Sequence, residues 1–118
     1  MANEFRTINS EDLSEFLKKC PFTVIHLDAI WDGYRGVVEK KIDLLIEKTL
    51  DTSFGYIDID DNQEYARSID LRNVPACSYY KETELIATVI GMQQDIEENL
   101  QILREGGTPD TSNKISRK

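Results

Sequence analysis

The chain is short of the residues that build disulfide bonds, metal centres and membrane anchors. Its 118 residues include two cysteines and one histidine, and a metal site needs several ligands. Long apolar runs are missing, so no segment approaches the length of a membrane span. The N-terminal "MANEFRTINSEDL" lacks the basic start and apolar stretch of a signal peptide. We therefore expect a cytoplasmic protein in which Cys20 and Cys77 remain free thiols.

Positive charge is also scarce. Lys and Arg number 14 against 22 Asp and Glu, which gives a formal net charge of −8. Residues 106–118 hold three basic residues and one acidic residue, a contribution of +2, so the remainder carries −10. Binding to phosphate groups needs clustered Lys and Arg. We therefore expect neither nucleic acid nor an anionic membrane among the partners.

The apolar content suffices for one folded domain. Hydrophobic residues make up 40% of the chain and aromatic residues 8%, which is ordinary for a globular protein of one core. No repeat or linker interrupts residues 1–105, which are predicted to form this domain. Gly106 and Gly107 are suited to end the last helix. Residues 106–118 show no apolar period and are predicted to form a flexible tail.

Apolar periodicity predicts alternating strands and helices. Strands are predicted in "FRTI", "PFTVIHLDAIW", "FGYIDID", "ACSYYK" and "LIATVIG", and helices in "SEDLSEFLKK", "VVEKKIDLLIEKTL", "DNQEYARSI" and "QQDIEENLQILRE". Asn9 and Ser10 are suited to cap the first helix, and Asp60, Asp61 and Asn62 the third. The order β-α-β-α-β-α-β-β-α predicts an α/β fold. About four helices would flank a mixed sheet of about five strands, which begins parallel and ends in a hairpin.

Several landmarks along residues 8–103 resemble the thioredoxin family. Trp31 ends a buried strand, like the tryptophan that opens the family's W-C-G-P-C motif. The segment "LRNVPACSYYK" places the family's cis-proline on Pro75. "YIDID" resembles the strand between these two landmarks, and "ATVIG" resembles the last strand with its glycine, Gly91. The order and spacing of these landmarks imply a thioredoxin-like fold.

The same resemblance shows where this chain departs from the family. In "WDGYR" the family's two cysteines fall on Asp32 and Arg35, its proline falls on Tyr34, and Gly33 matches its glycine. Disulfide exchange needs one thiolate to attack and a second thiol to resolve the mixed disulfide. A carboxylate and a guanidinium supply neither group. We therefore expect no dithiol–disulfide exchange and no catalytic residue at this segment.

The family's proton-relay positions have changed as well. Its buried aspartate falls on His26, and the lysine that partners this aspartate falls on Tyr56. We expect His26 to be a core histidine that hydrogen-bonds Tyr56, Asp58 or a backbone group. A catalytic or metal-binding role is the less favoured alternative.

A binding surface is the function that the resemblance favours. In the family, the tryptophan, the residue before the cis-proline and the late glycine line a groove that holds an extended peptide. The candidate residues here are Trp31, Asp32, Tyr34, Arg35, Val74, Pro75, Ile90 and Gly91. We expect a protein or extended peptide to bind there without a cofactor or metal. The exposed tryptophan and the edge hairpin also make a weak homodimer conceivable.

Asp32 and Arg35 allow two interpretations. Asp32 can cap the helix that begins near Gly33, and Arg35 can pair with Asp32 across one turn. This pair either forms part of a recognition surface or is only a helix cap with a weak surface bridge. The sequence favours neither interpretation.

Two enzyme functions remain as alternatives. Cys77 lies two residues beyond Pro75 and offers a thiol for an unusual oxidoreductase in cell redox homeostasis, although a buried core cysteine is the simpler account. Asp58, Asp60 and Asp61 offer carboxylates for a metal-dependent hydrolase. The simpler account of these three acids is the start of a helix.

Overall fold

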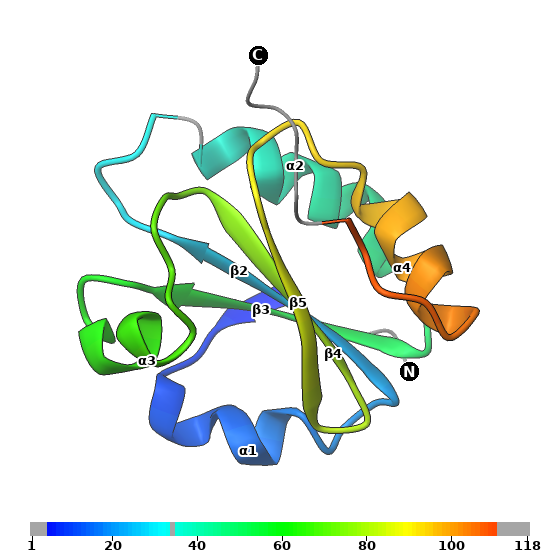
Figure 1. Ribbon diagram of the computed structural model, residues 1–118. Coiled ribbons are helices and arrows are strands. Elements are labelled where there is room, and N and C mark those ends of the chain that lie inside the picture. The colour runs from blue at the N-terminus through cyan, green and yellow to red at the C-terminus, as the bar shows by residue number, and fades with distance from the viewer. Residues whose placement is uncertain (1–4, 34, 111–118) are drawn as a thin grey trace.

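Figure 1 shows a computed structural model, which describes residues 5–33 and 35–110. Its strands are β1 (Phe5–Thr7), β2 (Phe22–Asp28), β3 (Thr52–Asp58), β4 (Ala76–Lys81) and β5 (Glu84–Ile90). Its helices are α1 (Leu13–Phe16), α2 (Arg35–Ile46), α3 (Gln63–Ser68) and α4 (Ile96–Arg104), with one 3-10 turn, η1 (Ser10–Asp12), before α1. The predicted order of strands and helices is confirmed.

The strands of the described chain form one mixed sheet in the order β1-β3-β2-β4-β5. β1 and β2 both run parallel to β3, whereas β4 is antiparallel to β2 and β5 is antiparallel to β4. The parallel start and the terminal hairpin are therefore as the sequence predicts. β2 lies at the centre, where the register places Val24 between Phe54 of β3 and Tyr79 of β4.

Helices cover both faces of the sheet, with α2 and α4 on one face and α1 and α3 on the other (Figure 1). The core under α2 and α4 contains Val24, Val38, Ile42, Leu45, Phe54, Cys77, Tyr79, Val89, Ile96, Leu100 and Leu103. The core on the other face contains Ile8, Leu13, Phe16, Leu17, Ile25, Leu27, Ile57, Ala76 and Tyr80. Successive residues of β2 enter different cores, which is why that strand is apolar on both faces.

The first helix is shorter than predicted, and its start is capped from elsewhere. Asn9 makes no side-chain capping bond, so the cap assigned to it is wrong. The side-chain oxygen of Asn62 instead accepts the Ser10 backbone N–H at 2.8 Å. Asn62 also makes no side-chain capping bond to α3, and its amide donates to the Asp58 carbonyl at 2.8 Å. A tertiary contact thus takes the place of a local cap.

The end of α4 follows the sequence closely. Gly106 has a φ of +88°, a left-handed conformation that glycine adopts without strain. Its backbone N–H donates to Leu103 at 3.0 Å, and that of Gly107 donates to Ile102 at 2.9 Å, the bond pattern of a Schellman motif. Pro109 is buried, so the first residues after the helix pack against the domain. Residues 111–118 lie outside the described part, and the flexible tail stays a prediction there.

Candidate functional site

Three strands bring the candidate residues to one end of the sheet. Leu27 near the end of β2 pairs with Ala76 at the start of β4, and Ala76 pairs with Ile90 at the end of β5. The Gly91 backbone N–H donates to the Pro75 carbonyl at 2.8 Å. The Val74–Pro75 peptide bond is cis, the isomer that the family resemblance implies. Pro75, Ile90 and Gly91 therefore lie together beside the end of β2, where the chain continues to Trp31.

Trp31 projects from this end of the sheet and is held in place by the neighbouring strand. Its side chain is 68% exposed, yet the indole Nε1–H donates to Asp60 Oδ2 at 2.8 Å. Asp60 follows β3, so the bond joins the segments after two adjacent strands. Asp60 was expected to cap α3, but its carboxylate binds Trp31. Asp58 Oδ1 accepts the Asp60 backbone N–H at 2.8 Å instead.

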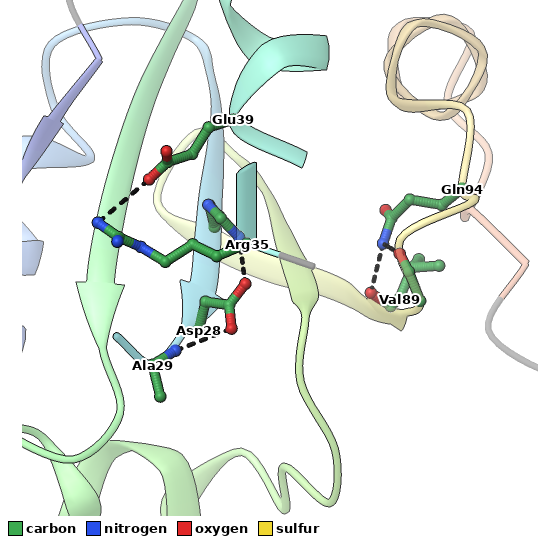
Figure 2. Close-up of polar contacts among 8 residues, drawn as sticks. Asp28, Ala29, Arg35, Glu39, Val89 and Gln94 are labelled. Atoms are coloured by element: carbon green, nitrogen blue, oxygen red, sulfur yellow. Dashed lines mark hydrogen bonds and ion pairs between the residues drawn. The ribbon is translucent and has the colours of Figure 1, made fainter. Parts of the chain in front are cut away.

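Arg35 begins α2 and turns its side chain along the helix. Its Nη2 lies 3.3 Å from Glu39 Oε2, one turn ahead (Figure 2). The guanidinium carbon lies 4.9 Å from the centre of the Tyr56 ring, a cation–π contact. Glu39 is an ion-pair partner of Arg35 because its (i, i+4) position suits an arginine in the first turn, and the expected pairing of Arg35 with Asp32 stays a prediction. Asp32 as a side-chain cap stays a prediction, and Tyr34 lies outside the described residues.

His26 and Asp28 form a buried polar pair at the end of β2, shortly before Trp31 in the chain. His26 Nε2 and Asp28 Oδ2 are 2.9 Å apart, and both side chains are fully buried. Asp28 Oδ1 accepts the Ala29 backbone N–H at 2.8 Å (Figure 2). His26 was expected to bind Tyr56, Asp58 or the backbone. Asp28 is its partner, and the Tyr56 ring packs 5.3 Å from the imidazole, centre to centre.

Burial shifts the pKa values of this pair in opposite directions. Burial, followed by the positive charge of Arg35, lowers the pKa of His26 to about 4. Burial, followed by a hydrogen bond with Asp32, raises the pKa of Asp28 to about 7. His26 is therefore neutral at neutral pH, whereas Asp28 changes charge near that pH. The sequence analysis missed Asp28, although an acid at the end of a strand with two apolar faces is a recognisable signal.

Cys77 is a poor nucleophile in this environment. It is fully buried opposite His26 in the β2–β4 register, and burial raises the pKa of its thiol to about 12. Reactive cysteines are thiolates with access to solvent. Neither Cys20 nor Cys77 forms a disulfide bond, as the sequence suggested. The position of Cys77 in the core therefore argues against the oxidoreductase alternative.

Gln94 fixes the turn that follows β5, and the sequence analysis missed it. Its side-chain nitrogen donates to the Val89 carbonyl at 2.8 Å (Figure 2). It also donates to the Gly91 carbonyl at 2.9 Å. Its side-chain oxygen accepts the Tyr79 hydroxyl at 2.6 Å. Beside this turn lies a hollow of about 620 Å³, lined by residues 89–95, by Glu98, Asn99 and Ile102 of α4, and by Asp110. Ile90 and Gly91 therefore border a concave surface on the α4 side.

No residue set in the described chain has the arrangement of a metal centre. Among residues 5–33 and 35–110, no group of three or more His, Cys, Asp and Glu side chains is placed to hold a metal ion. Asp58 and Asp60 instead accept the hydrogen bonds described above. Within the same residues, no helix has both the length and the apolar character needed to cross a bilayer.

Comparison with known proteins finds sequence similarity to thioredoxins. No family model matches the chain. A thioredoxin of Alternaria alternata is 27% identical over 84 residues, which cover 70% of this chain and 71% of that protein. A thioredoxin of Ophiophagus hannah is also 27% identical, over 89 residues, which cover 71% of this chain and 85% of that protein.

The solved structure of a mutant thioredoxin from Halobacterium salinarum matches with a TM-score of 0.76 at 25% sequence identity. The match covers 92% of this chain and 96% of that one. With this sheet order and these helices, the chain has the thioredoxin fold, and its sequence is similar to those of thioredoxins.

Proposed function

We propose that this chain is a redox-inactive thioredoxin-like protein that binds an extended segment of a partner protein. The binding surface, called the Trp31 surface below, consists of Trp31, Asp32, Arg35, Val74, Pro75, Ile90 and Gly91. Tyr34 belongs to it by its place in the sequence. The observation that carries the proposal is the state of Trp31, which is 68% exposed while its indole N–H is bound to Asp60.

A tethered and exposed tryptophan suits a binding role. Tryptophan combines a large contact area with few rotatable bonds, so fixing it in advance reduces the entropy lost on binding. Ile90 is 39% exposed at the end of β5, which is the edge strand on that side of the described sheet. An edge strand beside an aromatic anchor can hold a peptide by backbone hydrogen bonds and side-chain contact.

A thiol oxidoreductase is the competing function, because both sequence relatives are thioredoxins. Dithiol exchange moves two electrons between a pair of thiols and a disulfide. The segment from Trp31 to Arg35 contains no cysteine. Cys77 is buried with a raised pKa, and Cys20 precedes β2 at the opposite end of the strand from Trp31. This arrangement supports non-covalent binding over exchange.

Replacing Trp31 by alanine should abolish most of the binding. A displayed library of linear peptides is selected on the wild-type protein, and the dissociation constant of the best peptide is measured by fluorescence anisotropy. Loss of a central tryptophan typically costs about 2 kcal/mol or more, which is about 30-fold in affinity. We expect Trp31→Ala to weaken binding by at least this factor.

Leu50→Ala is the matched control, since Leu50 is an apolar side chain that is 65% exposed in the loop between α2 and β3. We expect this variant to bind like wild type. Equal binding by wild type and Trp31→Ala, or failure to select any peptide, would refute the Trp31 surface. A second copy of the chain could occupy the Trp31 surface in place of a peptide, and light scattering tests this by measuring the molar mass in solution. A wild-type dimer that Trp31→Ala converts to a monomer would show that the occupant is a second copy.

A further inference from the structure

The hollow beside Gly91 combines apolar side chains with negative charge. Its apolar members include Ile90, Met92 and Ile102, and its acidic members are Asp95, Glu98 and Asp110. Among the described residues that line it, none is Lys or Arg. The hollow therefore fits a chain segment that carries both apolar and basic side chains, because complementary charge favours such an occupant.

The chain returns to this hollow after α4. Residues 105–110 turn back past α4 toward β5 (Figure 1), and the Gly107 backbone N–H donates to the Ile102 carbonyl on the way. Pro109 is buried, and Asp110 lines the hollow. Asp110 is also where the described part of the chain ends. Residues 111–118 therefore continue from the hollow itself.

Residues 111–118, called the basic segment below, have the composition that the hollow fits. Their sequence, "TSNKISRK", contains Lys114, Arg117 and Lys118 and no acidic residue, a formal charge of +3. The whole chain carries −8, so residues 1–110 carry −11. Ile115 supplies one apolar side chain among the three basic ones. It lies five residues beyond Asp110, at most about 17 Å along an extended chain, so it can fold back across the hollow.

We propose that the basic segment docks in this hollow, with Ile115 against the apolar side chains and the three basic residues beside the carboxylates. Ile90 and Gly91 belong both to the hollow and to the Trp31 surface. The docked segment therefore competes with a partner segment for the end of β5. The docking concerns the free protein, whereas the competition rests on the proposed function. All contacts are non-covalent.

Tethering makes weak contacts sufficient for docking. Ion pairs between exposed side chains contribute little individually. A segment joined through a short stretch of chain, however, has an effective concentration in the millimolar range at its site. Because the basic segment starts at Asp110, its contacts with the hollow need not be strong enough to hold a separate peptide. The same eight residues added as a free peptide at micromolar concentration should not bind.

The other side of α4 is less suitable for this occupant. The hollows between α2 and α4 include Lys41, Lys48 and Arg104 among their lining residues. A basic segment would meet like charges there, and like charges oppose binding. Charge therefore directs the basic segment to the β5 side of α4.

Docking is measured on the full chain by nitrogen-15 NMR relaxation at about 0.1 M salt, where charges interact over about 10 Å. We expect the Ile115 amide of wild type to have an order parameter above about 0.6, the value below which a backbone is flexible. Ile115→Ser removes the apolar contact without changing the net charge. Glu98→Lys reverses one charge of the hollow. Each should bring the amide of residue 115 below that value.

Glu97→Lys is the matched control. Glu97 and Glu98 are both acids of the first turn of α4, but the Glu97 carboxylate lies 3.5 Å from Lys48 Nζ and is not part of the hollow. Both lysine variants change the net charge equally, so only Glu98→Lys should release the segment. A flexible Ile115 amide in wild type, or equal effects of the two lysine variants, would overturn the docking. So would a wild-type dimer that Glu98→Lys dissociates in light scattering, because a second copy would then be the occupant.

The competition is tested separately with the selected peptide. Ile115→Ser should bind this peptide about tenfold more tightly than wild type, the factor expected when the segment is docked nine-tenths of the time. An ordered basic segment in wild type with equal peptide affinity in both proteins would overturn the competition. Absence of any peptide binding would refute the proposed function, and the NMR measurement, which needs no peptide, would still decide the docking.

Discussion

Tyr79→Ala is expected to lower the free energy of unfolding by about 3–5 kcal/mol, the usual cost of truncating a buried aromatic side chain. Tyr79 is fully buried between the sheet and the α2–α4 layer. Its hydroxyl donates to Gln94 at 2.6 Å and accepts the Asn99 side-chain N–H at 3.0 Å. One side chain thus connects β4 with α4 and with the turn at Gly91.

Tyr79→Phe separates the hydrogen bonds from the packing. It keeps the ring and leaves Gln94 and Asn99 without this partner, so we expect a loss of about 1–3 kcal/mol. Tyr80→Phe is the matched control on the opposite face, where the hydroxyl meets the Tyr65 hydroxyl at 2.7 Å. Urea unfolding measures all three variants. If Tyr79→Phe lowers the free energy of unfolding no more than Tyr80→Phe does, the hydrogen bonds of Gln94 do not hold the Gly91 turn.

Placing cysteines at positions 32 and 35 should create the dithiol–disulfide exchange activity that the proposed function excludes for the wild type. We expect the double variant Asp32→Cys/Arg35→Cys to reduce a small-molecule disulfide, with dithiothreitol as electron source, at least about tenfold faster than wild type. The two positions are three residues apart at the start of α2, where the helix N-terminus lowers the pKa of a thiol. The reaction transfers two electrons from the new dithiol to the substrate disulfide, and dithiothreitol reduces the enzyme again.

A second dithiol provides the control for this gain. Asp61→Cys/Glu64→Cys places two cysteines with the same spacing at exposed positions near the start of α3. We expect this variant to stay within about twofold of wild type, because α3 has only six residues and its N-terminus lowers the pKa of a thiol less than that of α2 does. Equal activity of the two double variants would show that positions 32 and 35 do not favour disulfide exchange over other exposed positions. A wild-type rate of disulfide reduction above that of a Cys20→Ser/Cys77→Ser variant would support the alternative of an oxidoreductase that acts through Cys77.

The fold could be predicted because local pattern and tertiary structure agree along most of the chain. Val38, Ile42 and Leu45 recur at helical spacing and are buried in α2, and the apolar residues of β2 fill two cores. The cap of the first helix was predicted wrongly because a residue distant in sequence supplies the hydrogen bond. Asn62 binds Ser10 across 52 positions of sequence, and no local pattern around Asn9 reveals such a contact.

The site was predictable only in outline. The sequence places Trp31, Pro75 and Gly91, and the register brings Pro75 and Gly91 together at the end of β2. The contacts of Arg35 with Glu39, of His26 with Asp28 and of Asp60 with Trp31 were not predicted, because each depends on which way a side chain points from its helix or strand. Arg35 turns toward Glu39, and Asp60 reaches the indole of Trp31 from a different strand end. Sequence spacing carries no information on the contact between Asp60 and Trp31, which joins the ends of two different strands.

The most direct test asks whether partners are held without a disulfide. Wild type and Cys20→Ser/Cys77→Ser are immobilised, exposed to a native extract, and eluted first with the selected peptide and then with dithiothreitol. The binding account predicts that both proteins retain the same partner and that the peptide releases it before any reductant is added. A partner retained by wild type alone and released by dithiothreitol alone would contradict the account.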